Sequence, residues 1–298
     1  MSDLQHRNSK KISFLFFYYQ YINYFCSPIF NMKKISFLFI ISVVFLSACG
    51  EYQKLLKSTD PELKYTKAIE YFEKGDFMRA STLFDEIAIY YKGTERSEEV
   101  LNYIAKSYMG QKDYFSASEY YKTYVKTYPK GKYITEAKFM IGYCYYLDSP
   151  DARLDQTATY DAITALQEFV DVYPESERVQ EAYKLLDEMN DKLAYKYLIN
   201  SRLYYNLGNY LANNYESAVI TAQNGLKKFP TNKYREELSM IILEAKYQQA
   251  VQSVEEKKIE RYRNTIDEYY NFVNEFPEGK IKKQADRIFN ECKKIVKD

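Results

Sequence analysis

The sequence has little of what enzyme active sites and β-rich folds depend on. It contains no tryptophan and one histidine, His6, close to the N-terminus. A histidine-based metal site and a Ser-His or Cys-His nucleophile are therefore almost excluded. Glycine (9 residues) and proline (7 residues) are also scarce in a chain of 298, at roughly half their usual share. So few helix-breaking residues favour long helices over a β-fold.

The chain also has no excess of either positive or negative charge. The chain carries 42 Lys and Arg against 41 Asp and Glu, whereas nucleic-acid-binding proteins normally have a basic surplus. Nucleic acid is therefore not expected as a partner. The sequence also lacks a Gly-rich phosphate loop and a nucleophile elbow. We interpret the protein as a non-enzyme with no cofactor.

Cysteine is sparse, with four residues: Cys26, Cys49, Cys144 and Cys292. The last two lie in stretches of apolar residues at helical spacing. We predict that both are buried free thiols, because a cysteine in such a position behaves as a small apolar side chain.

The clearest signal near the N-terminus is an export sequence. Residues 32–48 begin with the basic pair Lys33 and Lys34 and continue with an apolar run over 35–46. This run is too short to span a bilayer comfortably but is typical of a signal peptide. It ends in the tetrapeptide LSAC, which resembles the lipobox of bacterial lipoproteins. The resemblance implies cleavage just before Cys49 and a covalent lipid on the Cys49 sulfur.

The segment before this signal is unusual. A signal peptide does not normally carry thirty residues ahead of its basic start, so we expect that translation begins at Met32 and that residues 1–31 are an over-extended N-terminus; a genuine longer leader starting at Met1 is the alternative. After cleavage, residues 49–60 would form a short lipidated tether. Residues 61–298 would form the folded domain.

The folded part contains a repeat. Four aromatic-proline pairs punctuate it, and a small residue stands twelve positions before each of the four prolines. This pattern resembles the tetratricopeptide repeat, in which small residues let paired helices approach and proline ends the second helix. It predicts an all-α superhelix (solenoid) of about five tetratricopeptide-like helix pairs; an irregular all-α domain is the alternative. The pairs and their small residues are Tyr128-Pro129 with Ala117, Tyr173-Pro174 with Ala162, Phe229-Pro230 with Ala218, and Phe276-Pro277 with Thr265.

Two repeats depart from the consensus spacing. Gly142 and Ala162 are 20 residues apart where 12 are expected, and the extra residues include a turn signal at 147–151. Ala245 and Thr265 are also 20 residues apart, but no Gly or Pro lies between them, so longer helices are expected there. The matches to a first helix are weak in the fourth and fifth pairs.

The start of the first helix is marked clearly. Asp60, Pro61 and Glu62 supply an N-cap side chain, a proline at the first helical position and an acid in the first turn. The first helix is therefore expected to begin at Pro61.

The first helix of each pair should line the inner surface of such a solenoid. The consensus register predicts a groove of mostly aromatic and aliphatic residues in the first three pairs. Tyrosine and phenylalanine supply large contact areas at low entropic cost, so the groove suits an extended peptide. The predicted substrate-peptide groove comprises Tyr65, Ile69, Phe72, Asn102, Lys106, Met109, Phe139, Tyr143 and Tyr146.

The joint layout is more specific than either part. A lipobox leader, a short tether and five helix pairs, together with the stretches 51–77, 143–179 and 233–238, resemble the BamD family of outer-membrane β-barrel assembly lipoproteins. The resemblance covers essentially all of the chain after the signal. It implies a non-enzymatic lipoprotein held at the outer membrane by its lipid and facing the periplasm.

The resemblance also implies partners for each half of the domain. An N-terminal half, about 61–175, would bind unfolded outer-membrane proteins. A C-terminal half, about 176–298, would dock on the periplasmic POTRA domains of a BamA-like barrel, beside other assembly lipoproteins. The family's docking arginine has no clear counterpart, because the stretch before Pro230 offers Lys227 and Lys228 instead.

A second interpretation shares the leader and the helices. Another envelope adaptor lipoprotein with tetratricopeptide helices, such as a secretin pilotin or a Tol-Pal-associated protein, would bind a different partner. The residues of this chain leave that alternative open.

Overall fold

The structure, a computed structural model, describes residues 50–296. The predicted over-extended segment 1–31, the signal peptide 32–48 and the lipidated Cys49 lie outside the described residues. Every regular element between residues 50 and 296 is helical, and this part of the chain contains no strand. None of its helices is both long enough and apolar enough to cross a membrane.

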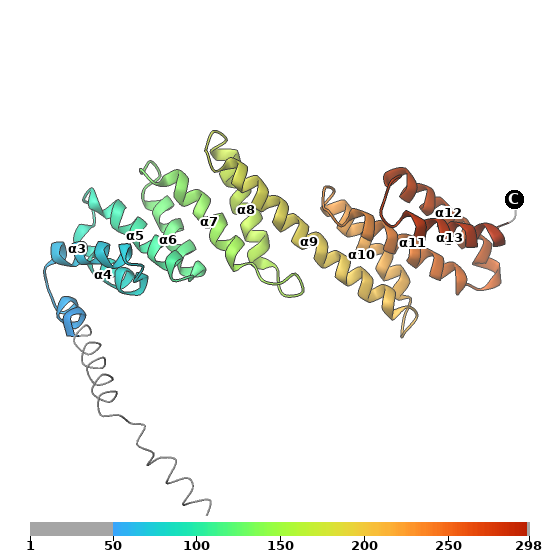
Figure 1. The fold of residues 1–298 in the computed structure, drawn as a ribbon, viewed down its shortest axis with the longest axis horizontal. Helices are drawn as coiled ribbons and strands as arrows, with labels where there is room; N and C mark the ends of the chain where they lie inside the picture. Colours follow the sequence, from blue (N-terminus) through green and yellow to red (C-terminus); the bar gives the residue numbers. More distant parts are fainter. Residues whose placement is uncertain (1–49, 297–298) are drawn as a thin grey trace, which may run out of the picture. The chain divides into compact units, whose positions relative to one another are not determined.

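The helices are labelled as in Figure 1. Residues 50–56 are also helical. The bounds are α3 Pro61–Glu73, α4 Phe77–Tyr91, α5 Arg96–Gly110, α6 Tyr114–Thr127, α7 Ile134–Asp148, α8 Thr157–Val172, α9 Val179–Leu207, α10 Asn214–Lys228, α11 Arg235–Val251, α12 Glu255–Glu275 and α13 Lys282–Ile295.

The chain divides into two compact units, Met1–Lys64 and Tyr65–Asp298. In the described part of the first unit, the Lys64 Nζ donates a hydrogen bond to the carbonyl oxygen of Leu56 at 2.9 Å. The carboxylate of Asp60 accepts the backbone N–H groups of Glu62 and Leu63 at 3.0 and 3.2 Å. The expected N-cap and the expected helix start at Pro61 are therefore confirmed.

The second unit is a stack of helical hairpins. Each helix from α4 to α13 packs against the next one in the chain, and the successive helices run back and forth in Figure 1. The odd-numbered helices from α7 onward also contact one another: α7 with α9, α9 with α11, and α11 with α13. Contacts restricted to near neighbours in sequence are the hallmark of a solenoid. The predicted all-α superhelix of helix pairs is confirmed.

Side-chain caps start the second helix of several pairs. The carboxylate of Asp76 accepts the Arg79 N–H before α4, and Asp113 accepts the Ser116 N–H before α6. Asn213 plays the same role before α10. Each cap satisfies a backbone donor that the first helical turn leaves unpaired, and replacing such a cap by alanine typically costs about 1 kcal/mol.

The aromatic-proline pairs end helices, as predicted. The aromatic residue is the C-cap in each case, and its N–H still donates to the carbonyl four residues earlier. The proline that follows has no N–H and cannot extend the helix. The four C-cap residues are Tyr128 on α6, Tyr173 on α8, Phe229 on α10 and Phe276 on α12.

The small residues of the repeat are buried. Ala117, Ala162 and Ala218 are fully buried, and Thr265 takes the same buried position in α12. Its hydroxyl donates to the Arg261 carbonyl oxygen at 2.9 Å, which satisfies the polar group inside its own helix. The pattern of small residues therefore predicted buried positions in the second helix of each pair.

The departures from the repeat have separate causes. The insertion in the third pair is the loop between the end of α7 at Asp148 and the start of α8 at Thr157. The fifth pair has no insertion, because α11 and α12 are 17 and 21 residues long. Both outcomes agree with the prediction.

Helix α9 is the largest surprise, with 29 residues in one continuous helix. Its first turns, including Leu185, pack against Phe169 of α8. Its later turns, including Leu198, pack against Ala218 of α10. One helix thus serves both the third and the fourth core, which explains the weak match to a separate first helix in the fourth pair. The predicted border at 175/176 falls in the turn just before α9.

Candidate binding face of the odd-numbered helices

The nine predicted groove residues lie on three odd-numbered helices, three each on α3, α5 and α7. We call the surface formed by the odd-numbered helices the odd-helix face. Seven of the nine are partly exposed. The structure therefore places most of the predicted groove on one set of helices, although the peptide-binding role itself stays a prediction.

Two of the nine residues are not on the surface. Phe139 is 0% exposed and Asn102 is 4% exposed. The Phe139 ring meets the Phe169 ring edge-on at 5.4 Å, and the Arg178 guanidinium lies 4.8 Å from its centre. A helix turns by about 100° per residue, so a small error in register moves a side chain from the groove to the core. For these two residues the groove assignment is wrong.

The α3 part of the groove is partly used for packing. The ring of Phe72 makes edge-on contacts with Phe77 of α4 at 5.4 Å and Tyr103 of α5 at 5.2 Å. Tyr65 packs against Tyr91 at 5.8 Å and lies under the Arg96 guanidinium at 5.1 Å. These rings join α3 to its neighbours and leave only part of their area open. Ile69, which lies between Tyr65 and Phe72 in the sequence, is half-buried.

The α5 part is similar. The Lys106 ammonium lies 5.7 Å from the ring centre of Tyr133, at a distance where cation–π attraction operates. The sulfur of Met109 is 3.3 Å from that of Cys144. Both predicted residues are half-buried, so they contribute to the face and to the contact between α5 and α7.

The α7 part forms a short aromatic stack. The Tyr143 ring lies between Phe139 at 5.8 Å and Tyr146 at 5.9 Å, nearly parallel to both. The Tyr146 hydroxyl donates to the Glu188 carboxylate of α9 at 2.6 Å. This hydrogen bond and, to a smaller extent, burial raise the pKa of Tyr146 to about 12. Tyr143 and Tyr146 are therefore held rigidly at the edge of the next hairpin.

A hollow of about 750 Å³ opens beside Tyr146, between α7, the insertion loop and α9; we call it the α7–α9 hollow. Its aromatic wall includes Tyr195 and Tyr234, whose ring centres are 5.1 Å apart. The Lys192 ammonium reaches into the loop and donates to the carbonyl and hydroxyl oxygens of Ser149 at 3.2 and 2.7 Å. Among residues 50–296, no carboxylate lies within 4.0 Å of this ammonium, and burial lowers the pKa of Lys192.

A second hollow, of about 580 Å³, lies between α9, α11 and α13; we call it the α9–α13 hollow. Tyr205, Met240 and Ile241 give it apolar walls. The half-buried Glu244 faces the same space and accepts a hydrogen bond from the side-chain amide of Gln284. Burial raises the pKa of Glu244.

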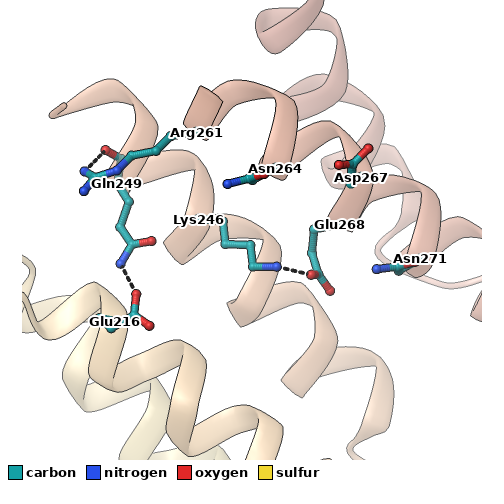
Figure 2. A pocket seen from close by; sticks show the side chains of 8 residues that line it. All are labelled: Glu216, Lys246, Gln249, Arg261, Asn264, Asp267, Glu268 and Asn271. Atoms are coloured by element: carbon teal, nitrogen blue, oxygen red, sulfur yellow. Dashed lines mark hydrogen bonds and ion pairs between the residues drawn. The ribbon is translucent and has the colours of Figure 1, made fainter. Parts of the chain in front are cut away.

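A third hollow, of about 370 Å³, lies among α10, α11 and α12 and is lined by polar side chains (Figure 2). One ion pair and several hydrogen bonds connect these side chains. The Lys246 ammonium pairs with the Glu268 carboxylate, and the side-chain amide of Gln249 donates to Glu216 at 2.7 Å (Figure 2). The Arg261 guanidinium donates to the Gln249 carbonyl oxygen at 3.3 Å. This network links the helices of the fourth and fifth pairs.

Two lysines end α10. Lys227 and Lys228 lie in its last turn, where cations complement the negative end of the helix dipole. The Lys228 ammonium lies 5.5 Å from the ring centre of Tyr197 on α9. This contact gives Lys228 a local structural partner.

The cysteines of the described region match the prediction. Cys144 and Cys292 are free and buried. Burial raises the pKa of the Cys144 thiol to about 12 and that of Cys292 to about 11, so neither is poised as a thiolate nucleophile. Between residues 50 and 296, no cluster of three or more His, Cys, Asp or Glu side chains has the arrangement of a metal site.

Sequence reasoning located the aromatic part of the odd-helix face but missed the hollows. They combine residues far apart in the chain; Glu244 and Gln284, for example, are 40 positions apart. The insertion at 147–151 was the only signal that pointed toward the α7–α9 hollow.

Comparison with known proteins relates this arrangement to one family. The model of the family described as YfiO, an outer membrane lipoprotein, matches residues 57–213. The chain is 29% identical over 152 residues to the outer membrane protein assembly factor BamD of Caulobacter vibrioides, covering 51% of this chain and 50% of that protein. It is 26% identical over 171 residues to a putative BamD of Aquifex aeolicus, covering 57% and 56%. The chain thus spans about half the length of the curated relatives it matches.

Among solved structures, the TPR2AB domain of yeast Sti1 in complex with pHSP90 aligns with 78% of this chain and 98% of that chain, at 13% identity and a TM-score of 0.38. At that score the comparison does not itself assign the fold, which rests on the helix packing described above. The family match, by contrast, covers more than half of the sequence, from just before α3 to the end of α9. The chain therefore belongs to the BamD (YfiO) family of outer membrane lipoproteins.

Proposed function

We propose that the protein is the lipid-anchored, non-enzymatic component of an outer-membrane β-barrel assembly complex. Membership of the BamD family, through the match over residues 57–213, is the observation that carries this proposal. The two curated relatives are named as outer membrane protein assembly factors. In this proposal the odd-helix face holds other proteins, and no bond is made or broken.

The anchor is the lipid on Cys49, and the folded domain follows it by a tether of only eleven residues. Such a tether reaches at most about 40 Å, so the solenoid stays close to the membrane. In cells, Cys49→Ser should abolish labelling with radioactive palmitate and move the protein from the membrane fraction to the soluble fraction. Ser47→Ala, which keeps a small residue before the cysteine, should leave both unchanged. A Cys49→Ser protein that stays in the membrane fraction would refute the anchor.

Capture of unfolded outer-membrane proteins would use the N-terminal part of the odd-helix face. Burial of two aromatic side chains of a nascent strand supplies roughly 3–5 kcal/mol, which gives weak and releasable binding. The partly exposed Phe72, Tyr143 and Tyr146 are the contact residues we propose for this step.

Photo-crosslinking tests this assignment. A crosslinking amino acid at Phe72 or Tyr143 should label the C-terminal segment of an unfolded barrel protein. The matched control is Phe115, a well-exposed aromatic residue on the even-numbered α6, which should label far less. Labelling from Phe115 but from neither of the other two positions contradicts the assignment.

Docking on the POTRA domains of a BamA-like partner would use the C-terminal half. The alternative is an envelope adaptor for a secretin or for the Tol-Pal system, and it shares the same leader and helices. Purification of the tagged protein from detergent-solubilised membranes separates the two, because the co-purified partner would be a BamA-like barrel in the first case and a secretin or a Tol-Pal protein in the second.

A further inference from the structure

One carboxylate on the odd-helix face has no ion-pair partner among the described residues. Glu244 lies in the middle of α11, is half-buried, and faces the α9–α13 hollow. Its polar contact is the side-chain amide of Gln284, a neutral donor. In the described part of the chain, no Lys or Arg nitrogen comes within 4.0 Å of its oxygens.

The basic residues around the hollow are engaged elsewhere or lie at its rim. Arg202 pairs with Glu237 at 3.0 Å, and Lys233 pairs with Asp191 at 3.2 Å. Lys280 lines the hollow but is an exposed residue of the turn before α13. Arg202 still attracts the Glu244 carboxylate, but burial outweighs this attraction and raises the pKa of Glu244, so the cations around the hollow offset its charge only in part.

The walls next to Glu244 are apolar. Met240 and Ile241, one turn earlier on the same helix, are buried, and Tyr205 faces them from α9. A carboxylate beside apolar walls is poorly solvated by water. A side chain that carries both methylene groups and a cation would pack against the walls and pair with the charge. Arginine and lysine are the side chains with that chemistry.

We infer that the α9–α13 hollow is a docking site for an arginine or lysine side chain, flanked by apolar residues, of the protein partner that binds the C-terminal half. The inference rests on the proposed docking function and adds the chemistry of the contact: the carboxylate belongs to this chain and the cation belongs to the partner. Glu244 lies beyond the residues 57–213 that the family model matches, so the assignment comes from the geometry alone.

The charge polarity of this contact follows from the surroundings. Glu236 is occupied by the Ile281 N–H at 2.8 Å, and Glu237 is occupied by Arg202. Glu244 is thus the one glutamate in the lining whose charge has neither an ion pair nor a backbone donor among residues 50–296. A partner cation would restore the electrostatic stabilisation that burial removes from this carboxylate.

The test uses the full lipidated chain in detergent micelles and the purified POTRA region of the BamA-like protein from the same organism as the probe. Binding constants are measured by biolayer interferometry at low and high salt. Glu244→Gln keeps the shape and the hydrogen bond from Gln284 but removes the charge, and it should weaken binding about 10- to 100-fold. Glu244→Lys should weaken it further. Glu256→Lys, on an exposed residue outside the hollow, should change binding less than about twofold, as rim charges do.

A charge-swap completes the design. Each Arg and Lys of the POTRA region is replaced by Glu, and one of these variants should restore binding to Glu244→Lys while losing it to the wild-type chain. Circular dichroism checks that each variant is folded; if Glu244→Lys is not folded, Glu244→Gln decides.

The outcomes separate the two levels of the argument. If Glu244→Gln binds the POTRA region as tightly as the wild-type chain does, the contact between Glu244 and a partner cation is refuted, and the docking function is left intact. A wild-type chain that does not bind the POTRA region at all overturns the proposed partner and the inference with it. Weakening by Glu244→Gln with rescue by one charge-swapped variant establishes the contact.

Discussion

The contact between α7 and α8 yields a prediction in which two effects of opposite sign compete. Gly142 lies inside α7, where glycine costs about 1 kcal/mol of helix stability relative to alanine. Taken alone, Gly142→Ala should stabilise the protein. However, a Cβ atom at this position would lie 2.7 Å from the Leu166 Cγ, 2.8 Å from its Cδ2 and 3.1 Å from its backbone nitrogen.

These contacts cannot be relieved by a side-chain rotation alone, since the nitrogen belongs to the backbone of α8. The two helices would have to separate, and overpacking of this kind typically costs about 1–3 kcal/mol. The contact should therefore outweigh the gain in propensity, with a net loss of up to about 2 kcal/mol. For a domain of this size the loss corresponds to a fall in melting temperature of up to about 8 °C.

Thermal unfolding followed by circular dichroism measures this directly. The control is Asn274→Ala in α12, an exposed helical position where alanine gains propensity without a new contact, so its melting temperature should stay the same or rise slightly. If Gly142→Ala melts at or above the wild-type temperature, α7 and α8 are not packed as closely as described. Cooperativity breaks down in long repeat arrays, so the first unfolding transition is the one to compare.

Three further predictions concern polar contacts. Tyr124→Phe removes a buried hydroxyl that donates to Glu98 and should lower stability by about 1–3 kcal/mol in urea unfolding. Burial raises the pKa of Asp85; the stabilisation that this carboxyl contributes is therefore complete below about pH 3.9 and is lost as the pH rises through the raised folded pKa, so Asp85→Asn should gain stability relative to wild type in urea unfolding as the pH rises above about 4. Lys192→Met removes both bonds to Ser149 and should speed tryptic cleavage of the α7–α8 loop about 10-fold or more, and an unchanged rate would contradict that role.

Much of the fold could be predicted because its signals are local. The N-cap at Asp60 and the C-caps at the aromatic-proline pairs act within one helical turn, so the residues that determine them are adjacent in sequence. The buried small residues, such as Ala117 and Ala162, repeat at a fixed distance from the proline. Local chemistry and repeat spacing agree here, which is why the boundaries of these hairpins were predictable.

The long helix α9 was missed although its sequence contains a usable signal. Residues 179–207 contain neither glycine nor proline, so nothing in them ends a helix. The expectation of a separate first helix in the fourth pair came from the repeat consensus and overruled this local evidence. The structure shows that the uninterrupted run of helix-compatible residues was the better guide.

The candidate site was only partly predictable, and the reason is geometric. The consensus register assigns a side chain to the groove or to the core from its position in the repeat. On a helix, a shift of about one residue is enough to move a side chain from one to the other. Phe139 was assigned to the groove but lies in the core, whereas Tyr143, four residues later, remained partly exposed. Burial depends on how α8 and α9 close over α7, and no single repeat contains that information.

Two desolvated charges on the odd-helix face bear on the stability of the chain. In the two hollows of the odd-helix face, Lys192 and Glu244 are desolvated without an ion-pair partner among the described residues. A desolvated single charge lowers the stability of the isolated chain, and in a solenoid that local cost is not offset by distant repeats. A bound protein that carries the opposite charges would offset it, so these two hollows are where binding and stability should be coupled: partner binding should raise the melting temperature of the wild-type chain more than that of a chain with neutral residues at both positions.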